Sequence, residues 1–309
     1  MPGTKPSEEQ VLSYFNSCSN WGRWGPADEL GTINFITPER RRAAAQLVRE
    51  GVSVSCSLLI VSNEPGARIQ PVHYMTNAGE KWAGKKNVGN TLQFSKDFIG
   101  LIFHGTTITH IDSLAHIFWD GKMYNGQPAE KVTTAEGATV ESVDAVKDGI
   151  VARGVLLDLP RLRNKPWLDP GEGVYPEDLE EAERAEGVKV QSGDVLLVRY
   201  GNHRRAKEAP QSTGGAGMQA ASIPWLHQRE IALLGSDGAQ EVSSGYRNLM
   251  MPVHQIGIVA MGLWLLDNAN LEDLAQTCAR LGRWEFMLTI NALRVQYGTG
   301  SPVNPVATF

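Results

Sequence analysis

The chain has 309 residues, of which 42% are hydrophobic and 20% charged, as is ordinary for a globular protein. Its net charge is −5 and its lysines and arginines are scattered, which argues against a nucleic-acid partner. No run approaches the ~18 apolar residues of a membrane span, and the polar start MPGTKPSEEQ lacks the features of a secretory signal. The three cysteines, Cys18, Cys56 and Cys278, form no CxxC pair, so we expect reduced thiols and a cytoplasmic protein.

The first third of the chain predicts two helices followed by strands. Residues 8–17 can form a short helix. Thr37, followed by Pro38 and an acidic first turn, has the pattern of a helix N-terminus, and this helix should end near residue 50. Strands are predicted at residues 51–61, where apolar and polar residues partly alternate, and at residues 98–110, which are rich in Ile, Phe and Thr.

Strands and helices alternate in the remainder of the chain. Apolar runs bounded by glycine or charged residues predict strands at residues 149–158, 193–200, 231–235 and 286–295. Acidic or amphipathic patterns predict helices at residues 176–186, 221–230 and 271–281. Residues 254–264 are apolar in a pattern that fits either element, and the polar residues 204–217 predict a loop.

No segment has the composition of a linker that would divide the chain. We therefore predict an α/β fold, in which residues 41–309 form a single domain with a mixed β-sheet core and flanking helices. Residues 1–40 are predicted to form an N-terminal arm.

Three histidines fall within thirteen residues, in the segment HGTTITHIDSLAH. If the strand continues to Asp112, His110 and Asp112 project from the same face and can hold a divalent ion together. A turn after Asp112 can bring His116 back over that ion. The ion would activate water and polarise a carbonyl, while the histidine would move protons between water and leaving group.

A His-x-Asp pair alone often arises by chance, and a buried histidine that hydrogen-bonds a carboxylate explains it equally well. His104 is a further histidine on the predicted strand, six residues before His110. Along a straight strand it would lie about 20 Å from His110, too far to share a metal unless Gly105 breaks the strand.

The segment THIDSLAHIFWDGKMYNG resembles the signature His-x-Gly-Thr-His-x-Asp-x-x-x-His of the cyclase family, whose members include bacterial kynurenine formamidase, isatin hydrolase and a dienelactone hydrolase. The likeness extends over most of the chain, including NWGRWGPADELGTIN, GDVLLVRYG, IALLGSDGAQEV and VHQIGIVAMGLWLLDNANLEDLA. It implies a β/β/α cyclase-like fold and a metal-dependent hydrolase.

The resemblance also implies roles for single residues. His110 and Asp112 match metal ligands, and His116 matches the histidine assigned to proton transfer. Positions that match later ligands, with an uncertainty of about one residue in register, are His254, Gln255 and Asp267. Trp119, which follows the motif, is a candidate for stacking on a flat substrate.

Thr106 stands where the family signature has its first histidine. A threonine hydroxyl is a poor zinc ligand beside imidazole and carboxylate, so we expect one divalent ion, Mn²⁺ or Zn²⁺, rather than two zinc ions.

The resulting prediction is hydrolysis of a C–N or C–O bond in a cyclic amide, aryl formamide or lactone. A non-haem iron oxygenase is one alternative, because His110, Asp112 and His254 formally make a two-histidine, one-carboxylate triad. A non-catalytic binding protein of the same fold is the other. The expected partners are a small-molecule substrate and further copies of the chain in a dimer or tetramer, with neither nucleic acid nor membrane.

Overall fold

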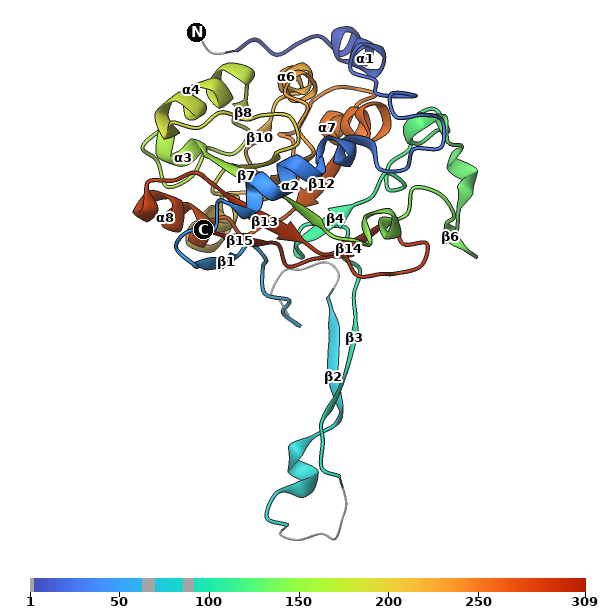
Figure 1. Ribbon diagram of the computed structural model, residues 1–309, viewed down its shortest axis with the longest axis vertical. Coiled ribbons are helices and arrows are strands. Elements are labelled where there is room, and N and C mark those ends of the chain that lie inside the picture. Colours follow the sequence, from blue (N-terminus) through green and yellow to red (C-terminus); the bar gives the residue numbers. More distant parts are fainter. Residues whose placement is uncertain (1–2, 63–69, 86–91) are drawn as a thin grey trace.

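The computed structural model describes residues 3–62, 70–85 and 92–309, and its core is one nine-stranded mixed sheet (Figure 1). In spatial order the strands of this sheet are β1 (Ser53–Ser55), β15 (Val306–Thr308), β13 (Glu285–Ile290), β7 (Ile150–Asp158), β9 (Val195–Arg199), β11 (Leu233–Ser236), β12 (Trp264–Asp267), β4 (His110–Asp112) and β14 (Gly300–Pro302). The α/β fold with a mixed sheet is therefore confirmed.

The centre of the sheet is parallel and its margins are antiparallel. Strands β7, β9, β11 and β12 run parallel to one another, while β4 pairs antiparallel with both β12 and β14. Every residue of β9, β11 and β12 is buried. Strands that are covered on both faces have continuous runs of apolar residues, which are easy to recognise in the sequence. The strands predicted at residues 149–158, 193–200 and 231–235 are accordingly confirmed to within two residues at each end.

Helices flank this sheet (Figure 1). They are α1 (Glu8–Ser17), α2 (Pro38–Ala45), α3 (Leu159–Leu162), α4 (Pro176–Glu186), α5 (Asn202–Glu208), α6 (Ile223–Gln228), α7 (Pro252–Ile256) and α8 (Glu272–Leu281). Short 3-10 turns lie at η1 (Gly31–Phe35), η2 (Gly79–Trp82), η3 (Tyr124–Gly126), η4 (Ala129–Lys131), η5 (Val143–Val146) and η6 (Ala220–Ser222). None of the described helices is both long and apolar enough to cross a membrane.

The helix predictions with clear end signals are confirmed. Helices α1 and α4 have the predicted bounds, and α8 begins one residue later than predicted. Thr37 caps α2 as expected, because its hydroxyl accepts the backbone N–H of Arg40. The helix ends at Ala45, not near residue 50, and the predicted loop at residues 204–217 is partly wrong because α5 extends to Glu208.

The predicted strand at residues 98–110 is only partly confirmed. Residues 98–100 belong to β3 (Lys96–Gly100) and His110 begins β4, but the backbone between them is irregular. Gly105 lies in this stretch with a φ of 147°, a conformation that favours glycine. β-Branched residues favour a strand only where a neighbouring strand completes the hydrogen-bond ladder, and here the chain turns from a hairpin into the sheet.

Other strand predictions are too long. Only Ser53–Ser55 of residues 51–61 is in a strand, and β13 ends at Ile290, before residue 295. The ambiguous residues 254–264 contain three elements in succession: most of α7, a π-helical turn η7 (Gly257–Met261) and the start of β12.

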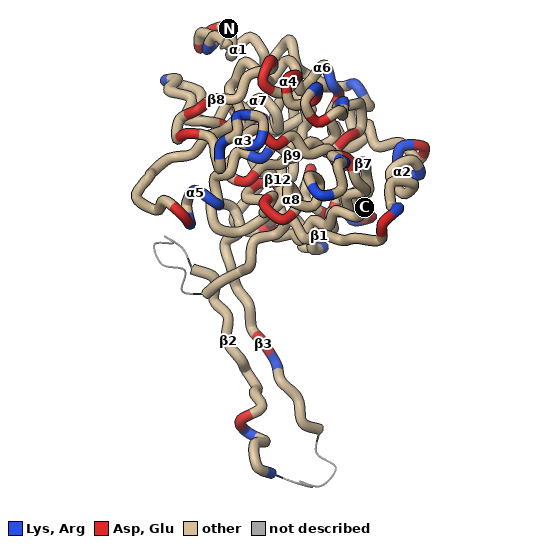
Figure 2. The backbone as a smooth tube through the Cα atoms, turned by 90° about the vertical axis from the view of Figure 1, so that its left-hand side faces the viewer, with Lys and Arg blue, Asp and Glu red and all other residues tan. Residues whose placement is uncertain are grey.

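Smaller two-stranded sheets are β2 (Val72–Asn77) with β3, β5 (Val132–Thr133) with β6 (Gly137–Ala138), and β8 (Gly173–Val174) with β10 (Gly217–Met218). The β2–β3 hairpin stands away from the body along the long axis of the molecule, as two views at right angles show (Figures 1 and 2).

Glu141 is a buried carboxyl group outside the sheet. It is 0% exposed, and neither carboxyl oxygen has a hydrogen-bond partner in the described structure. Burial, reinforced by the nearby carboxylates of Glu29 and Asp28, raises the pKa of Glu141 from 4.5 to about 9. The folded protein therefore keeps this carboxyl neutral at pH values where the unfolded chain ionises it.

The substitution Glu141→Gln should stabilise the protein more at pH 8 than at pH 5. Because the folded pKa is raised, the wild type loses stability as pH rises from about 4.5 towards 9, and the uncharged glutamine removes this loss. Thermal unfolding of both proteins at the two pH values measures the difference, with the exposed Glu136→Gln as control. An equal effect at both pH values would contradict the protonated state of Glu141.

Candidate metal centre

Asp112 lies at the centre of the site because of the position of β4. This short strand is inserted between β12 and β14, with Asp112 opposite Leu265 and His110 opposite Asp267. The side chain of Asp112 is 0% exposed, and neither of its carboxylate oxygens has a hydrogen-bond partner in the described structure. A buried charge without partners is costly, so this carboxylate requires positive charge nearby.

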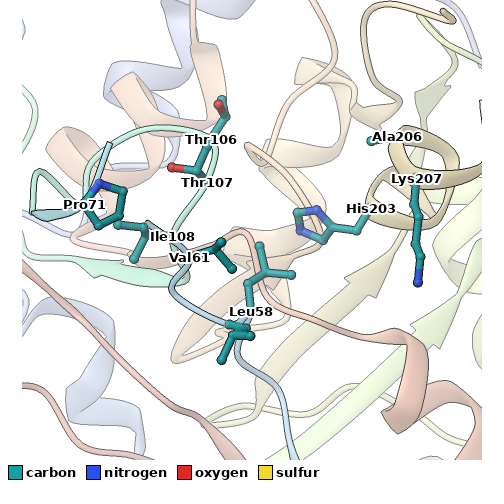
Figure 3. Close-up of a pocket in the computed structure, with 10 residues that line it drawn as sticks. Leu58, Val61, Pro71, Thr106, Thr107, Ile108, His203, Ala206 and Lys207 are labelled. Carbon is teal, nitrogen blue, oxygen red and sulfur yellow. The ribbon is translucent and has the colours of Figure 1, made fainter. Parts of the chain in front are cut away.

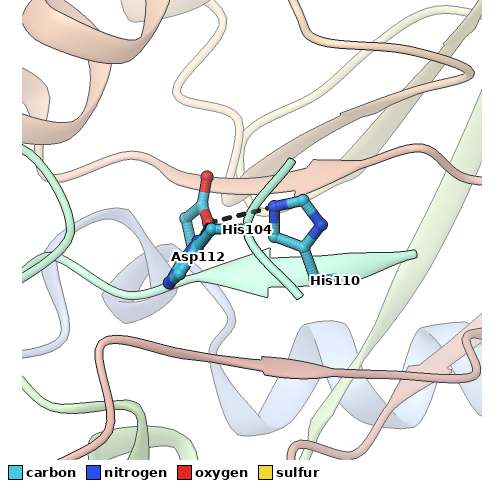
Figure 4. Close-up of side chains that lie close together, drawn as sticks. All are labelled: His104, His110 and Asp112. Carbon is cyan, nitrogen blue, oxygen red and sulfur yellow. Dashed lines mark ion pairs between the residues drawn. The ribbon is translucent and has the colours of Figure 1, made fainter. Parts of the chain in front are cut away.

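Four histidines lie near this carboxylate, and Figure 4 shows two of them, His104 and His110. Asp112 Oδ1 lies 2.9 Å from His104 Nδ1 and 3.5 Å from His110 Nε2. It lies 3.9 Å from His116 Nε2, and Asp112 Oδ2 lies 3.7 Å from His254 Nε2. The structure thus brings the distant His254 together with His110, Asp112 and His116, which are neighbours in the sequence.

Two of these histidines are held with Nε2 facing the carboxylate. His110 Nδ1 donates to the backbone oxygen of Ile108 at 2.8 Å. His254 Nδ1 lies 2.7 Å from Oε2 of Glu241, whose side chain is only 4% exposed. Metal-binding histidines commonly donate their other ring N–H to a carbonyl or carboxylate, which fixes the tautomer and directs the lone pair at the metal.

Asp267, at the carboxyl end of β12, supplies a second carboxylate. Its Oδ1 accepts a hydrogen bond of 2.7 Å from the side-chain amide of Gln240, and its Oδ2 lies 3.3 Å from His254 Nε2. One oxygen is therefore engaged by Gln240, while the other faces the same space as His254.

His104 and His116 form a parallel pair at the more open side of the site. Their ring centroids are 3.8 Å apart with an interplanar angle of 1°, and their side chains are 23% and 25% exposed. His104 Nε2 lies 3.1 Å from the hydroxyl of Thr299. Its Nδ1, although close to Asp112, is not aligned for a hydrogen bond and has no partner. The break at Gly105 thus brings His104 to the site, where an unbroken strand would have held it away.

The electrostatics of the site favour a charged carboxylate. Burial alone would raise the pKa of Asp112, but His104, together with the charges of His116, His110 and His254, outweighs it and lowers this pKa. Burial lowers the pKa of His116 to about 4, against the opposing attraction of Asp112. Burial also opposes protonation of His254, yet Glu241 and Asp267 raise its pKa well above the ordinary value.

The donor atoms fit a divalent cation. Among the described residues, two groups of donors lie within 4.8 Å of one another, His104 with His110 and Asp112, and Asp112 with His254 and Asp267. The partnerless oxygens of Asp112 and the partnerless Nδ1 of His104 lie where a cation would satisfy them. Imidazole and carboxylate donors without sulfur suit Zn²⁺ or Mn²⁺.

Two predicted residues have other contacts. The side-chain oxygen of Gln255 accepts the backbone N–H of Met251 at 3.1 Å, and Gln255 belongs to neither donor group. The indole of Trp119 stacks on Phe15 of α1, with centroids 4.7 Å apart. One face of the indole is therefore covered by the protein itself.

Glu241 and Gln240 were not identified from the sequence, although they orient His254 and Asp267. Their spacing from these partners, 13 and 27 residues, follows no local pattern. A chemical argument could have indicated such a residue, because a buried histidine that binds a metal needs a hydrogen-bond acceptor for its second ring N–H.

A pocket of about 480 Å³ adjoins the chain segment that carries His104 and His110 (Figure 3). It is lined by Leu58, Leu59, Val61, Pro71, Thr106, Thr107, Ile108, His203, Ala206 and Lys207. Asn268, which follows Asp267, donates to the backbone oxygens of Gly105 and Ile108 and so ties this wall to the carboxyl end of β12. Ligands of α/β sheets commonly bind at this end of the strands.

His203 enters the same pocket from α5. Strand β11 separates β9 from β12, so the carboxyl ends of β9 and β12 are about 10 Å apart. The turn after β9 is fixed by Asp237, which accepts backbone N–H groups from Tyr200, Gly201 and Asn202. Burial lowers the pKa of His203 to about 4, and its Nε2 has no hydrogen-bond partner in the described structure.

Comparison with known proteins gives consistent results. The family model described as "Putative cyclase" matches residues 61–240. A crystal structure described as a novel cyclase is 31% identical, with a TM-score of 0.86, and the match covers 94% of this chain and 99% of that one. No curated protein matches the chain.

Two isatin hydrolases share the fold at lower identity. Isatin hydrolase A from Labrenzia aggregata, bound to benzyl benzoate, is 17% identical with a TM-score of 0.57, covering 85% of this chain and 94% of that one. Isatin hydrolase A from Ralstonia solanacearum is 16% identical with a TM-score of 0.57, covering 99% of both chains.

The substitution Glu241→Gln should weaken metal binding by about 10- to 100-fold, because the amide can still accept from His254 but no longer supplies negative charge. Titration of the metal-free protein with Zn²⁺ or Mn²⁺ in a calorimeter measures the affinity. The exposed Glu39→Gln is the matched control and should bind as the wild type does. Unchanged affinity in Glu241→Gln would exclude a role for Glu241 in orienting a ligand.

Proposed function

The chain belongs to the cyclase family, and from this premise we propose that it is a metal-dependent hydrolase. Its reaction is the cleavage of a C–N or C–O bond in a cyclic amide, an aryl formamide or a lactone. The observation that carries the proposal is the partnerless, fully buried carboxylate of Asp112, which is surrounded by imidazoles and adjoins a pocket through the 104–110 segment.

The proposed cofactor is one divalent cation, Mn²⁺ or Zn²⁺, held by Asp112 with His110, His254 and Asp267. A cation there would polarise the substrate carbonyl and lower the pKa of a water molecule that it binds. The sequence argument for a single ion rested on Thr106, but His104 now completes a second donor group that shares Asp112. If both groups held an ion, His104 and His110 would hold one with Asp112, and His254 and Asp267 would hold the other with Asp112.

His116 is the proposed proton-transfer residue. Its ring lies against His104, its Nε2 is 3.9 Å from Asp112 Oδ1, and a quarter of its side chain is exposed. It therefore borders the donor groups without being part of either one. In this role Nε2 takes the proton released by attacking water and returns it to the leaving nitrogen or oxygen. The parallel contact with His104 restricts rotation of the ring.

The pocket would receive the body of the substrate. Aliphatic side chains from Leu58, Val61 and Ile108 offer an apolar lining, while the Thr106 and Thr107 hydroxyls offer hydrogen bonds. Figure 3 shows the imidazole of His203 pointing from α5 into this space, where its free Nε2 can contact a polar substituent. Stacking of Trp119 on a flat substrate stays a proposal, and it is limited to the indole face that Phe15 does not cover.

The donor set favours hydrolysis over the alternative oxygenase. An iron oxygenase triad needs two histidines and one carboxylate, whereas the two donor groups together contain three histidines and two carboxylates. We also keep a cytoplasmic location and a homo-oligomer, a dimer or tetramer, as proposals. The location is supported by Cys18, Cys56 and Cys278, all of which are buried and free.

The substitution Asp112→Ala should abolish binding of all metal, because Asp112 belongs to both donor groups. His104→Ala should leave the metal content unchanged if one cation is bound, and should remove one of two if both groups are filled. Elemental analysis of the purified proteins after dialysis distinguishes these cases. Metal retained in Asp112→Ala would refute the proposed centre.

His116→Ala should lower the rate of hydrolysis by about 10²- to 10⁴-fold while the metal content stays unchanged. Hydrolysis of isatin, an aryl formamide and an aryl lactone is followed spectrophotometrically, with and without a chelator, which should also abolish it. His227→Ala is the control, since His227 contacts Asn20 and is in neither donor group. Full activity after chelation would rule out the metal-dependent reaction.

A further inference from the structure

The pocket of about 480 Å³ has an uneven charge. Its described lining contains one lysine, Lys207, and no arginine, aspartate or glutamate. The other members of this lining are aliphatic side chains, two threonine hydroxyls and His203. Burial lowers the pKa of His203 to about 4, so its imidazole is uncharged at neutral pH. At that pH the described lining therefore carries one positive charge and no negative charge.

Helix α5 presents His203 and Lys207 on one face. The two residues are four apart, and side chains at this spacing lie on the same side of a helix. Figure 3 shows both extending from α5 on one side of the pocket, while Thr106, Thr107 and Ile108 lie on the other. The pocket thus has one wall that leads into β4 and the metal donors, and a second wall, across from it, that carries the lysine.

Side-chain contacts with the loop that follows hold α5 in place. Asn202, the first residue of α5, both donates to the backbone oxygen of Ala216 at 2.9 Å and accepts its N–H at 3.1 Å. Arg205 is buried, and its guanidinium donates to two backbone oxygens of the same loop. These contacts fix the helix that carries Lys207 without any bound ligand.

Lys207 has no acidic partner among the described residues. Glu208, the neighbouring acidic residue of α5, pairs instead with Arg204 at 2.9 Å, and Lys207 belongs to none of the ion pairs in the described parts of the chain. A positive charge beside apolar walls is screened less than one in bulk water, so it attracts an anion more strongly. The pocket is therefore complementary to a ligand with an apolar body and one negative charge.

We propose that the substrate carries a carboxylate remote from the bond that is cleaved, and that Lys207 binds this carboxylate beside His203. This inference rests on the proposed hydrolase function and narrows its substrates to acids with one negative charge. In its Nε2–H tautomer, His203 donates a hydrogen bond to the same carboxylate without adding charge. A phosphate group fits less well, because phosphate sites generally combine several donors, such as arginines or the backbone amides of a helix N-terminus.

Matched pairs of an acid and its neutral amide test the preference for charge. We compare para-formamidobenzoate with para-formamidobenzamide as substrates, following release of the aryl amine spectrophotometrically. We compare para-aminobenzoate with para-aminobenzamide as ligands by calorimetry, which needs no reaction. Lys207→Met removes the charge but keeps an unbranched side chain, and Lys207→Arg keeps the charge. Lys147→Met is the matched control, because Lys147 is exposed and lies in neither the pocket nor the metal centre.

In the wild type and in Lys147→Met, kcat/KM should be about 10- to 100-fold higher for the acid than for the amide, and the acid ligand should bind more tightly by a similar factor. Lys207→Met should lose both preferences. The loss should appear in KM with kcat unchanged, because the contact is made equally in the ground state and the transition state. Lys207→Arg should keep both preferences.

The outcomes separate this inference from the proposed function. Hydrolysis without a preference for the acid in either measurement would overturn the inference and leave the hydrolase intact. A preference that persists in Lys207→Met would also overturn it, because the carboxylate is then bound elsewhere. A binding preference that depends on Lys207 in a protein without hydrolase activity would support the carboxylate site and count against the hydrolase.

Discussion

The structure around the site depends on one electrostatic constraint, the burial of the Asp112 carboxylate without a hydrogen-bond donor. Such a group is tolerated only when cations lie within a few ångströms of it. The nearest residues can supply this positive charge. Imidazoles approach both oxygens of Asp112, and they can either be protonated themselves or bind a metal cation. The same arrangement that makes the charge tolerable therefore also forms donor groups able to hold a metal ion.

The fold meets this constraint by placing a three-residue strand within the sheet. Because β4 is held on both sides by β12 and β14, His110 and Asp112 cannot shift along the sheet without breaking two ladders. Asp267 arrives opposite His110 through the same register. The π-helical turn before β12 follows directly on α7, so His254 and Asp267 reach the site from the two ends of one short segment. The positions of His110, Asp112 and Asp267 are thus fixed mainly by main-chain hydrogen bonds between strands, and few side-chain contacts are needed.

The sequence predicted those parts of the fold that local signals determine. Capping residues and amphipathic spacing located α1, α4 and α8, and unbroken apolar runs located the parallel strands β7, β9 and β11 but not β12. It did not predict the irregular backbone at residues 101–109, because Ile, Phe and Thr favour a strand only when a partner strand is present. His110, Asp112, His116 and His254 were found because motif and family resemblance marked them. The contribution of His104 depended on the backbone at Gly105, and that of Glu241 on tertiary contact, which spacing does not encode.

The departure at Thr106 is easier to understand once the irregular segment is considered. A regular strand through residues 104–110 would place His104 far from Asp112. The irregular backbone shortens the path, so His104 reaches the carboxylate while Thr106 is directed into the pocket wall. An imidazole therefore lies beside Asp112 although position 106 is threonine, and Thr106 lines the pocket that is proposed to receive the substrate.

The metal centre and the neighbouring pocket are connected through the chain that leaves the β2–β3 hairpin. Thr106 to Ile108 line the pocket of about 480 Å³ and carry the chain to His110. Asn268, which follows Asp267, holds the same segment through the backbone oxygens of Gly105 and Ile108. A substitution that moves this segment would therefore change the lining of the pocket and the position of His104 and His110 together.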